Sequence, residues 1–133
     1  MTDIVLSSEV SVKIKKSLNK MLVTSGAHSV LLIDKSGQLI ASAGDPSTLD
    51  IMALSALTAA NFGATSEIAK LLGEEEFSVL YHKGKNESIN FSTVGDELIM
   101  VTLFDNRTSL GLVRLRINSA TQELLEIFKG ILY

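Results

Sequence analysis

The sequence has no cysteine and no tryptophan, and its 133 residues include only one proline, Pro46. Without cysteine the chain has no disulfides, no thiolate metal ligands and no thiol nucleophile. A single proline and a hydrophobic fraction of 46% are typical of dense regular structure and not of a disordered adaptor. A domain of this length removes about two-thirds of its unfolded surface from water, so we expect residues 1–133 to fold as a single domain without cross-links.

Charge is also scarce. Lysine and arginine number 12 and aspartate and glutamate 15, which gives a net charge of -3 and no electrostatic reason to expect nucleic acid or an anionic membrane as partner. Residues 1–6 carry Asp3 where a signal peptide is basic, and their apolar stretch is short for such a peptide. The sequence therefore predicts a cytoplasmic protein with no membrane insertion.

The longest segment without charge, residues 51–66, has the composition of a helix. It is too short, and through Ser55, Thr58, Asn61 and Thr65 too polar, to span a bilayer. A helix without a charged face has to be covered on two sides, and a domain this small usually covers only one. We expect a helix that begins after a cap at Ser47 or Thr48, ends near Leu72 and Gly73, and is covered on its second side by another polypeptide.

No catalytic constellation stands out. The sequence lacks both the phosphate-binding pattern G-x-x-x-x-G-K-[ST] and the nucleophile pattern G-x-S-x-G. His28 and His82 are isolated, and the three glutamates at residues 74–76 have the composition of a solvated turn. We therefore predict no catalytic residue, no cofactor and no metal site, which makes an enzyme the least favoured class.

Three arginines remain to be explained. Arg107 precedes the last helix, where it would either reach a partner's phosphates as an arginine finger or brace Asp105; the brace is favoured. Arg114 and Arg116 lie near the start of that helix, where a positive charge opposes the helix dipole. A carboxylate on the sheet or on a partner is therefore expected to stabilise them.

Apolar periodicity divides the rest of the chain into alternating helices and strands. One helix is expected around residues 10–22, between a cap at Ser7 or Ser8 and Gly26. A final helix is expected from Leu110 almost to the last residue, although residues 113–117 taken alone alternate like a strand. Five strands are expected at residues 30–33, 38–43, 77–82, 88–94 and 98–104.

This order, α-β-β-α-β-β-β-α, predicts an α+β domain with three layers. Its five-stranded antiparallel sheet would carry one helix on one face and two on the other. The strand at residues 77–82 would be an edge, and exposed edges are templates for pairing. Small side chains on the uncharged helix would let a second backbone approach closely. We therefore predict a homodimer, with these interface residues: Ala56, Ala59, Phe77, Val79 and Tyr81.

Two segments carry a resemblance to a known family. IDKSGQLIASAG at residues 33–44 and FDNRTSLGLVRLRI at residues 104–117 resemble the roadblock/dynein light-chain family, and within it the bacterial MglB branch. Residues 57–61 and 68–73 of the middle helix are also similar to that branch. The resemblance implies a roadblock-like fold and a homodimer that joins its sheets through the edge at residues 77–82, with the two uncharged helices side by side.

The resemblance also implies a function. MglB-type proteins stimulate GTP hydrolysis by MglA, a small Ras-like GTPase of bacterial cell polarity and gliding motility. They need not supply an arginine, and the resemblance implies that they reshape the GTPase so that its own catalytic groups are positioned. The chain would then be cytoplasmic and concentrated at a cell pole through its partners. The expected GTPase contacts are Ala60, Gly63, Ala64, Glu67, Lys70 and Leu71. Two alternatives stay open: the same residues pack within the dimer, or the chain is a non-catalytic scaffold that docks a GTPase or other proteins without changing hydrolysis.

Overall fold

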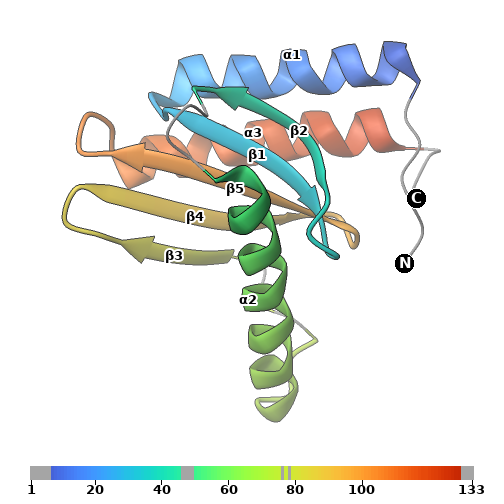
Figure 1. Cartoon of the computed structure of the whole chain (residues 1–133), viewed down its shortest axis with the longest axis vertical. Helices are drawn as coiled ribbons and strands as arrows, with labels where there is room; N and C mark the ends of the chain where they lie inside the picture. The colour runs from blue at the N-terminus through green and yellow to red at the C-terminus, as the bar shows by residue number, and fades with distance from the viewer. Residues whose placement is uncertain (1–6, 46–49, 76, 78, 130–133) are drawn as a thin grey trace.

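The computed structural model describes residues 7–45, 50–75, 77 and 79–129 (Figure 1). The described part of the chain forms three helices and five strands in the predicted order. They are α1 (Ser8–Ser25), β1 (Ser29–Asp34), β2 (Leu39–Gly44), α2 (Ile51–Leu71), β3 (Val79–Lys83), β4 (Glu87–Val94), β5 (Leu98–Asp105) and α3 (Leu110–Phe128).

The strands form one antiparallel sheet in the order β2-β1-β5-β4-β3. The prediction of an α+β fold with a five-stranded antiparallel sheet is confirmed. The chain enters the sheet next to its centre, builds the β1–β2 hairpin outward, and returns after α2 to build β3, β4 and β5 inward. The edges of the described sheet are therefore β2 and β3.

Side chains of the central strand β5 alternate between two cores, as the strand period of two requires. Leu98, Met100 and Phe104 pack in a core with α1 and α3, whereas Ile99 and Val101 pack in a core with Phe62 of α2. The first core is the larger, and its side chains Leu18, Leu32, Val113 and Phe128 are fully buried. Among the described helices, α1 and α3 thus cover one face and α2 alone covers the other (Figure 1).

Local signals explain most helix boundaries. The Ser7 Oγ accepts a hydrogen bond from the Val10 N–H, and Gly26 ends α1 in the left-handed conformation at φ 76°. The Ser109 Oγ accepts from the Leu112 N–H at the start of α3. The predicted helix over residues 113–117 is confirmed, because Val113 and Ile117 both point into the core.

Two boundaries differ from prediction. The cap of α2 is Asp50, whose Oδ1 accepts from the Ala53 N–H at 3.0 Å, so the choice of Ser47 or Thr48 is wrong; both lie outside the described residues. Asp50 lies one residue before the helix, where its carboxylate reaches the free N–H groups of the first turn. Strand β3 begins at Val79, so Phe77 precedes the strand instead of opening it.

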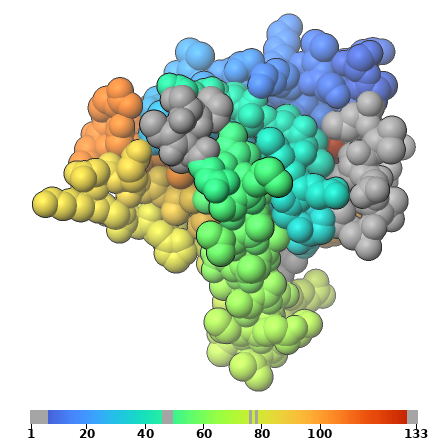
Figure 2. Space-filling model, viewed as in Figure 1, coloured from blue at the N-terminus to red at the C-terminus, as the bar shows by residue number. Residues whose placement is uncertain are grey.

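The position of α2 matters most for function. Its first half lies over the sheet, where Ser55, Thr58 and Phe62 are buried beneath it. Its second half extends past the strands, as a projection of the molecule in both the ribbon and the space-filling views (Figures 1 and 2). The structure therefore presents much of α2 to solvent.

Candidate functional site

The outer side of α2 is apolar and exposed. Met52, Leu57, Ile68 and Leu71 are exposed by 85%, 68%, 50% and 87%. Exposed apolar residues are ordinary when they are scattered, but a group of them on one helix indicates an interaction surface. We call these four side chains, together with the exposed small residues Ala60, Gly63 and Ala64, the α2 surface.

The residues predicted to contact a GTPase lie together on this surface. Ala60, Gly63, Ala64, Glu67, Lys70 and Leu71 are all exposed. A Cβ built on Gly63 meets nothing within 4 Å, so a larger side chain fits there without disturbing the fold. The Lys70 Nζ lies 3.2 Å from the Glu67 Oε1, which places an ion pair at the end of an otherwise uncharged surface. Apolar contact areas with such a polar rim are typical of protein interfaces.

The residues predicted for the dimer interface are less uniform. Ala56 and Ala59 lie beside the β1–β2 turn of their own chain, since a Cβ on Gly37 would be 3.3 Å from the Ala56 Cα and 3.5 Å from the Ala59 Cβ. Phe77 lines a small cavity of about 150 Å³ beneath α2, together with Phe62. These three residues thus have neighbours within the protomer.

The other two predicted dimer residues lie on β3. Val79 is 47% exposed at the start of this edge strand. Tyr81 is half-buried, and its ring stacks on Phe104 with a centroid distance of 6.1 Å. Of the five predicted residues, Val79 therefore offers the most open side chain at the edge.

Sequence reasoning did not single out Leu57 and Ile68 as exposed apolar residues of α2. At 3.6 residues per turn they project from the flank of α2 opposite to Ala59, and therefore away from the β1–β2 turn and toward the β3 side of the sheet. Leu54, one turn before Leu57, packs against the same core as Leu80 of β3, and both are only partly buried. The signal was present in their helical spacing, but their direction relative to β3 depends on the fold.

The two edges of the described sheet differ in protection. At β2, the Lys15 ammonium donates to the Ser42 carbonyl, and the pairing of β1 with β2 shifts register between Leu32 and Ile33. Charged side chains and irregular pairing are devices that block edge-to-edge association. Strand β3 pairs regularly with β4 from Val79 to Lys83. The β3 edge is thus the better template for a second strand.

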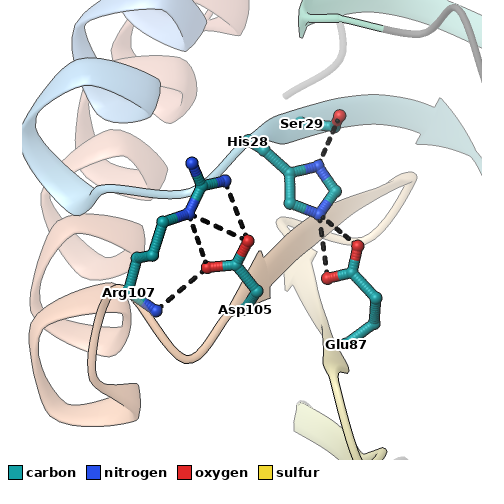
Figure 3. Close-up of polar contacts among 5 residues, drawn as sticks. All are labelled: His28, Ser29, Glu87, Asp105 and Arg107. Carbon is teal, nitrogen blue, oxygen red and sulfur yellow. Dashed lines mark hydrogen bonds and ion pairs between the residues drawn. The ribbon is translucent and has the colours of Figure 1, made fainter.

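Arg107 forms the predicted brace with Asp105 (Figure 3). Its Nε lies 3.0 Å from both carboxylate oxygens, and its Nη2 lies 2.8 Å from Oδ2. The Arg107 hydrogen bonds lower the pKa of Asp105 from 3.8 to about 2, and the carboxylate in turn raises the pKa of Arg107. The guanidinium is therefore paired within its own chain, on a side chain that is 77% exposed.

The two histidines occupy structural positions. The Nδ1 of His28 lies 3.0 Å from the Ser29 Oγ, and its Nε2 lies 2.9 Å from the Glu87 Oε1, so the ring connects the residue before β1 to the first residue of β4 (Figure 3). His82 packs edge-to-face on Phe91. Within residues 7–45, 50–75, 77 and 79–129, no three histidine or carboxylate side chains are grouped to hold a metal ion.

The arginines of α3 lack the carboxylate expected on the described sheet. The Arg114 guanidinium lies over the Tyr81 ring, 5.8 Å from its centre. The Arg116 Nε is buried, with no hydrogen-bond partner among the described residues. A cation over an aromatic face gains about 0.5–1 kcal/mol at an exposed site.

The family of the chain can now be stated. The sequence model of the Roadblock/LC7 domain matches residues 13–104, and the chain belongs to this family. Within it, the chain is similar to MglB proteins. Myxococcus xanthus MglB superposes with a TM-score of 0.91 at 42% identity, with 98% of each chain covered.

Two further MglB structures agree. The gliding protein MglB of Thermus thermophilus and an MglB with tetrameric arrangement both superpose with a TM-score of 0.91 at 29% identity, with 98% of each chain covered. No curated protein matches the sequence. Of the helices in the described part of the chain, none is both long and apolar enough to cross a membrane.

Proposed function

We propose that residues 1–133 form one roadblock-like domain, which acts as a homodimeric regulator of a small Ras-like GTPase of the MglA type and stimulates its GTP hydrolysis. The observation that carries this proposal is the α2 surface, where Met52, Leu57 and Leu71 are more than two-thirds exposed on a helix that extends past its own sheet. The similarity to MglB proteins supports the assignment of the partner.

The dimer is proposed to form through β3. An antiparallel pair of β3 edges would continue the sheet across both protomers and place the two α2 helices beside each other. The flank of α2 that carries Leu57 and Ile68 is directed toward this side of the sheet. Pairing therefore removes both side chains from water, and each gains up to about 1.5–3 kcal/mol when fully buried.

The GTPase is proposed to bind the remaining outer side of the α2 surface. Ala60, Gly63 and Leu71 supply a contact that a second protein can approach closely, and Glu67 and Lys70 supply its polar rim. The regulator is proposed to lack an active site of its own and to act by holding the catalytic groups of the GTPase in place. It would be cytoplasmic, with any concentration at a cell pole coming from its partners.

The ion pair of Arg107 with Asp105 supports a regulator that positions the catalytic groups of the GTPase and supplies no arginine itself. An arginine finger has to project toward the bound nucleotide, whereas this guanidinium is paired through two of its nitrogens. We expect Arg107→Ala to change stimulated hydrolysis by less than about twofold in a single-turnover assay. A loss of about 100-fold or more would identify Arg107 as a finger and contradict the mechanism.

Single-turnover GTP hydrolysis by an MglA-type GTPase, with and without this protein, tests the function. We expect the rate constant to rise at least tenfold. Binding without any change in rate would favour the alternative, a roadblock-type scaffold. Absence of binding to both the GTP-loaded and the GDP-loaded forms would contradict the regulatory function and leave only a scaffold that docks other proteins.

The contact surface is tested with a matched pair of substitutions. Gly63→Arg places a long side chain on the α2 surface, and Gly111→Arg places one on α3; a Cβ at either glycine meets nothing within 4 Å. We expect Gly63→Arg to abolish GTPase binding and Gly111→Arg to leave it unchanged, with circular dichroism and melting temperature near wild type for both. Normal binding by the Gly63 variant would show that the proposed surface is wrong.

A further inference from the structure

A second candidate site lies on the face of the sheet opposite to α2. A groove of about 420 Å³ runs between the β3–β4 hairpin and α3. Val79 lines it on the β3 side, and Arg114, Asn118 and Thr121 line it on the α3 side. A volume of this size is within the range of ligand-binding pockets.

The floor of the groove is polar and incompletely hydrogen-bonded. Asn90 and Ser92 of β4 line it and are only 1% and 5% exposed. The Asn90 Oδ1 and the Ser92 Oγ have no hydrogen-bond partner in the described part of the chain. A buried polar atom without a partner costs free energy, so these two atoms gain when a ligand supplies one. Apolar residues at these two positions would complete the core more favourably.

Arg114 supplies the only charge among the described residues that line the groove. Within the described residues its guanidinium contacts the Tyr81 ring and no carboxylate. Its position near the start of α3 is opposed by the helix dipole, which gives a further reason to expect a negatively charged partner. The side chain is exposed and therefore able to turn toward one.

We infer that this groove binds an extended acidic peptide segment of a partner protein. A peptide backbone N–H donates to the Asn90 Oδ1, and the Ser92 hydroxyl and the Asn118 amide donate to peptide carbonyls. Arg114 leaves the Tyr81 ring to pair with an aspartate or glutamate side chain, which opens the floor of the groove. Amide, hydroxyl and guanidinium groups in this arrangement match both the backbone and the charge of such a segment. The site is independent of the GTPase, because α2 lies on the other face of the sheet.

Selection of a random peptide library on the immobilised full-length protein tests the inference. Selected peptides, synthesised with a fluorescent label, are measured by anisotropy against wild type and variants. We expect the peptides to contain aspartate or glutamate. Arg114→Gln and Asn118→Asp should each weaken binding at least tenfold, while Ser119→Asp, a charge on the neighbouring exposed position of α3, should change it less than twofold.

NMR spectra of the side-chain amides show where the peptide binds. We expect those of Asn90 and Asn118 to shift on peptide addition. Selection without acidic peptides, binding indifferent to both groove variants, or shifts confined to α2 would each overturn the inference. A second copy of the chain in the groove would overturn it too, and would appear as dissociation of the dimer by Asn118→Asp with no selected peptide.

Discussion

At the scale of single residues, the molecule uses its few charged groups locally. Arg107 braces Asp105, and Lys20 holds Glu123 at 2.8 Å across the α1–α3 contact. The Lys20 hydrogen bond, assisted by one from Ser17, lowers the pKa of Glu123. These ion pairs fix the loop before α3 and the packing of two helices, and neither is directed toward a substrate.

The Asp105 pKa gives a prediction on pH. Because the folded pKa is depressed from 3.8 to about 2, the brace stabilises the fold above pH 3.8 and ceases to do so as the pH falls through 2. Arg107→Gln should therefore be less stable than wild type at neutral pH and equal to it below pH 2. Urea unfolding at several pH values measures this difference.

A direct titration completes the experiment. We expect the Asp105 carboxyl carbon to titrate at about 2 in wild type and to move toward 3.8 in Arg107→Gln. Lys16→Gln, which removes an exposed charge on α1, is the control and should leave both curves unchanged. An Asp105 pKa in its ordinary range in wild type would contradict the brace.

The core gives a second prediction at this scale. Phe128, the last residue of α3, is fully buried, and Phe128→Ala should lower the free energy of unfolding by about 3–5 kcal/mol through lost burial and a cavity. Leu115→Ala on the outside of the same helix, where Leu115 is 56% exposed, should change it by less than about 0.5 kcal/mol. Chemical denaturation measures both. Equal effects would show that α3 is not anchored at its end.

At the scale of elements, α2 is the unusual member. Its buried residues are Ser55, Thr58, Phe62 and Ala69, and the two hydroxyl oxygens are buried without a partner in the described residues. The helix thus gains less from its own sheet than α1 and α3 gain from theirs. We therefore expect the capping interaction and the proposed partner chains to contribute more to the position of α2 than they do for α1 and α3.

The cap can be tested directly. Asp50→Ala removes the acceptor of the Ala53 N–H and should destabilise the protein by about 1 kcal/mol. Asp50→Asn keeps an acceptor oxygen and should cost much less. Thermal unfolding followed by circular dichroism compares them. If both variants were equally unstable, charge and not the hydrogen bond would account for the effect.

The elements were largely predictable from the sequence, since their causes are local. Periodicity and the caps at Ser7 and Gly26 determine α1, and the continuing apolar row from Val113 to Phe128 decides α3 against a strand. The cap of α2 was misplaced because three capping residues, Ser47, Thr48 and Asp50, competed within four positions. The surface residues Leu57 and Ile68 were missed because their direction depends on where β3 lies in the sheet.

The groove beside α3 could not be predicted from the sequence either. It required β4 and α3 to lie together, and nothing local distinguishes Asn90 or Ser92 from ordinary outward-facing strand residues. Arg114 was the one signal, because its position against the helix dipole indicated a missing carboxylate.

At the scale of the whole molecule, the described sheet has one protected and one open edge, and a helix surface lies near the open one. The homodimer proposed on this basis predicts twice the mass of one chain by light scattering at micromolar concentration. Val79→Glu and Leu57→Glu, both at the proposed interface, should shift the protein toward monomer because charge at a buried interface is costly.

Val12→Glu is the matched control for these variants. Val12 is 66% exposed on α1, away from β3, and its substitution should leave the dimer intact. A wild-type protein that is only monomeric in dilute solution would remove the basis of the proposed interface. If only the Val12 variant dissociated the dimer, the interface would lie on the α1 side and not at β3.

The projection of α2 beyond the sheet has a consequence for its dynamics. In residues 63–71 most side chains are exposed and Ala69 is the buried one, and stretches of helix with little tertiary support open readily in water. Deuterium should therefore enter the amides of residues 63–71 faster than those of residues 55–62. A partner protein that binds this part of α2 should slow the deuterium uptake there first.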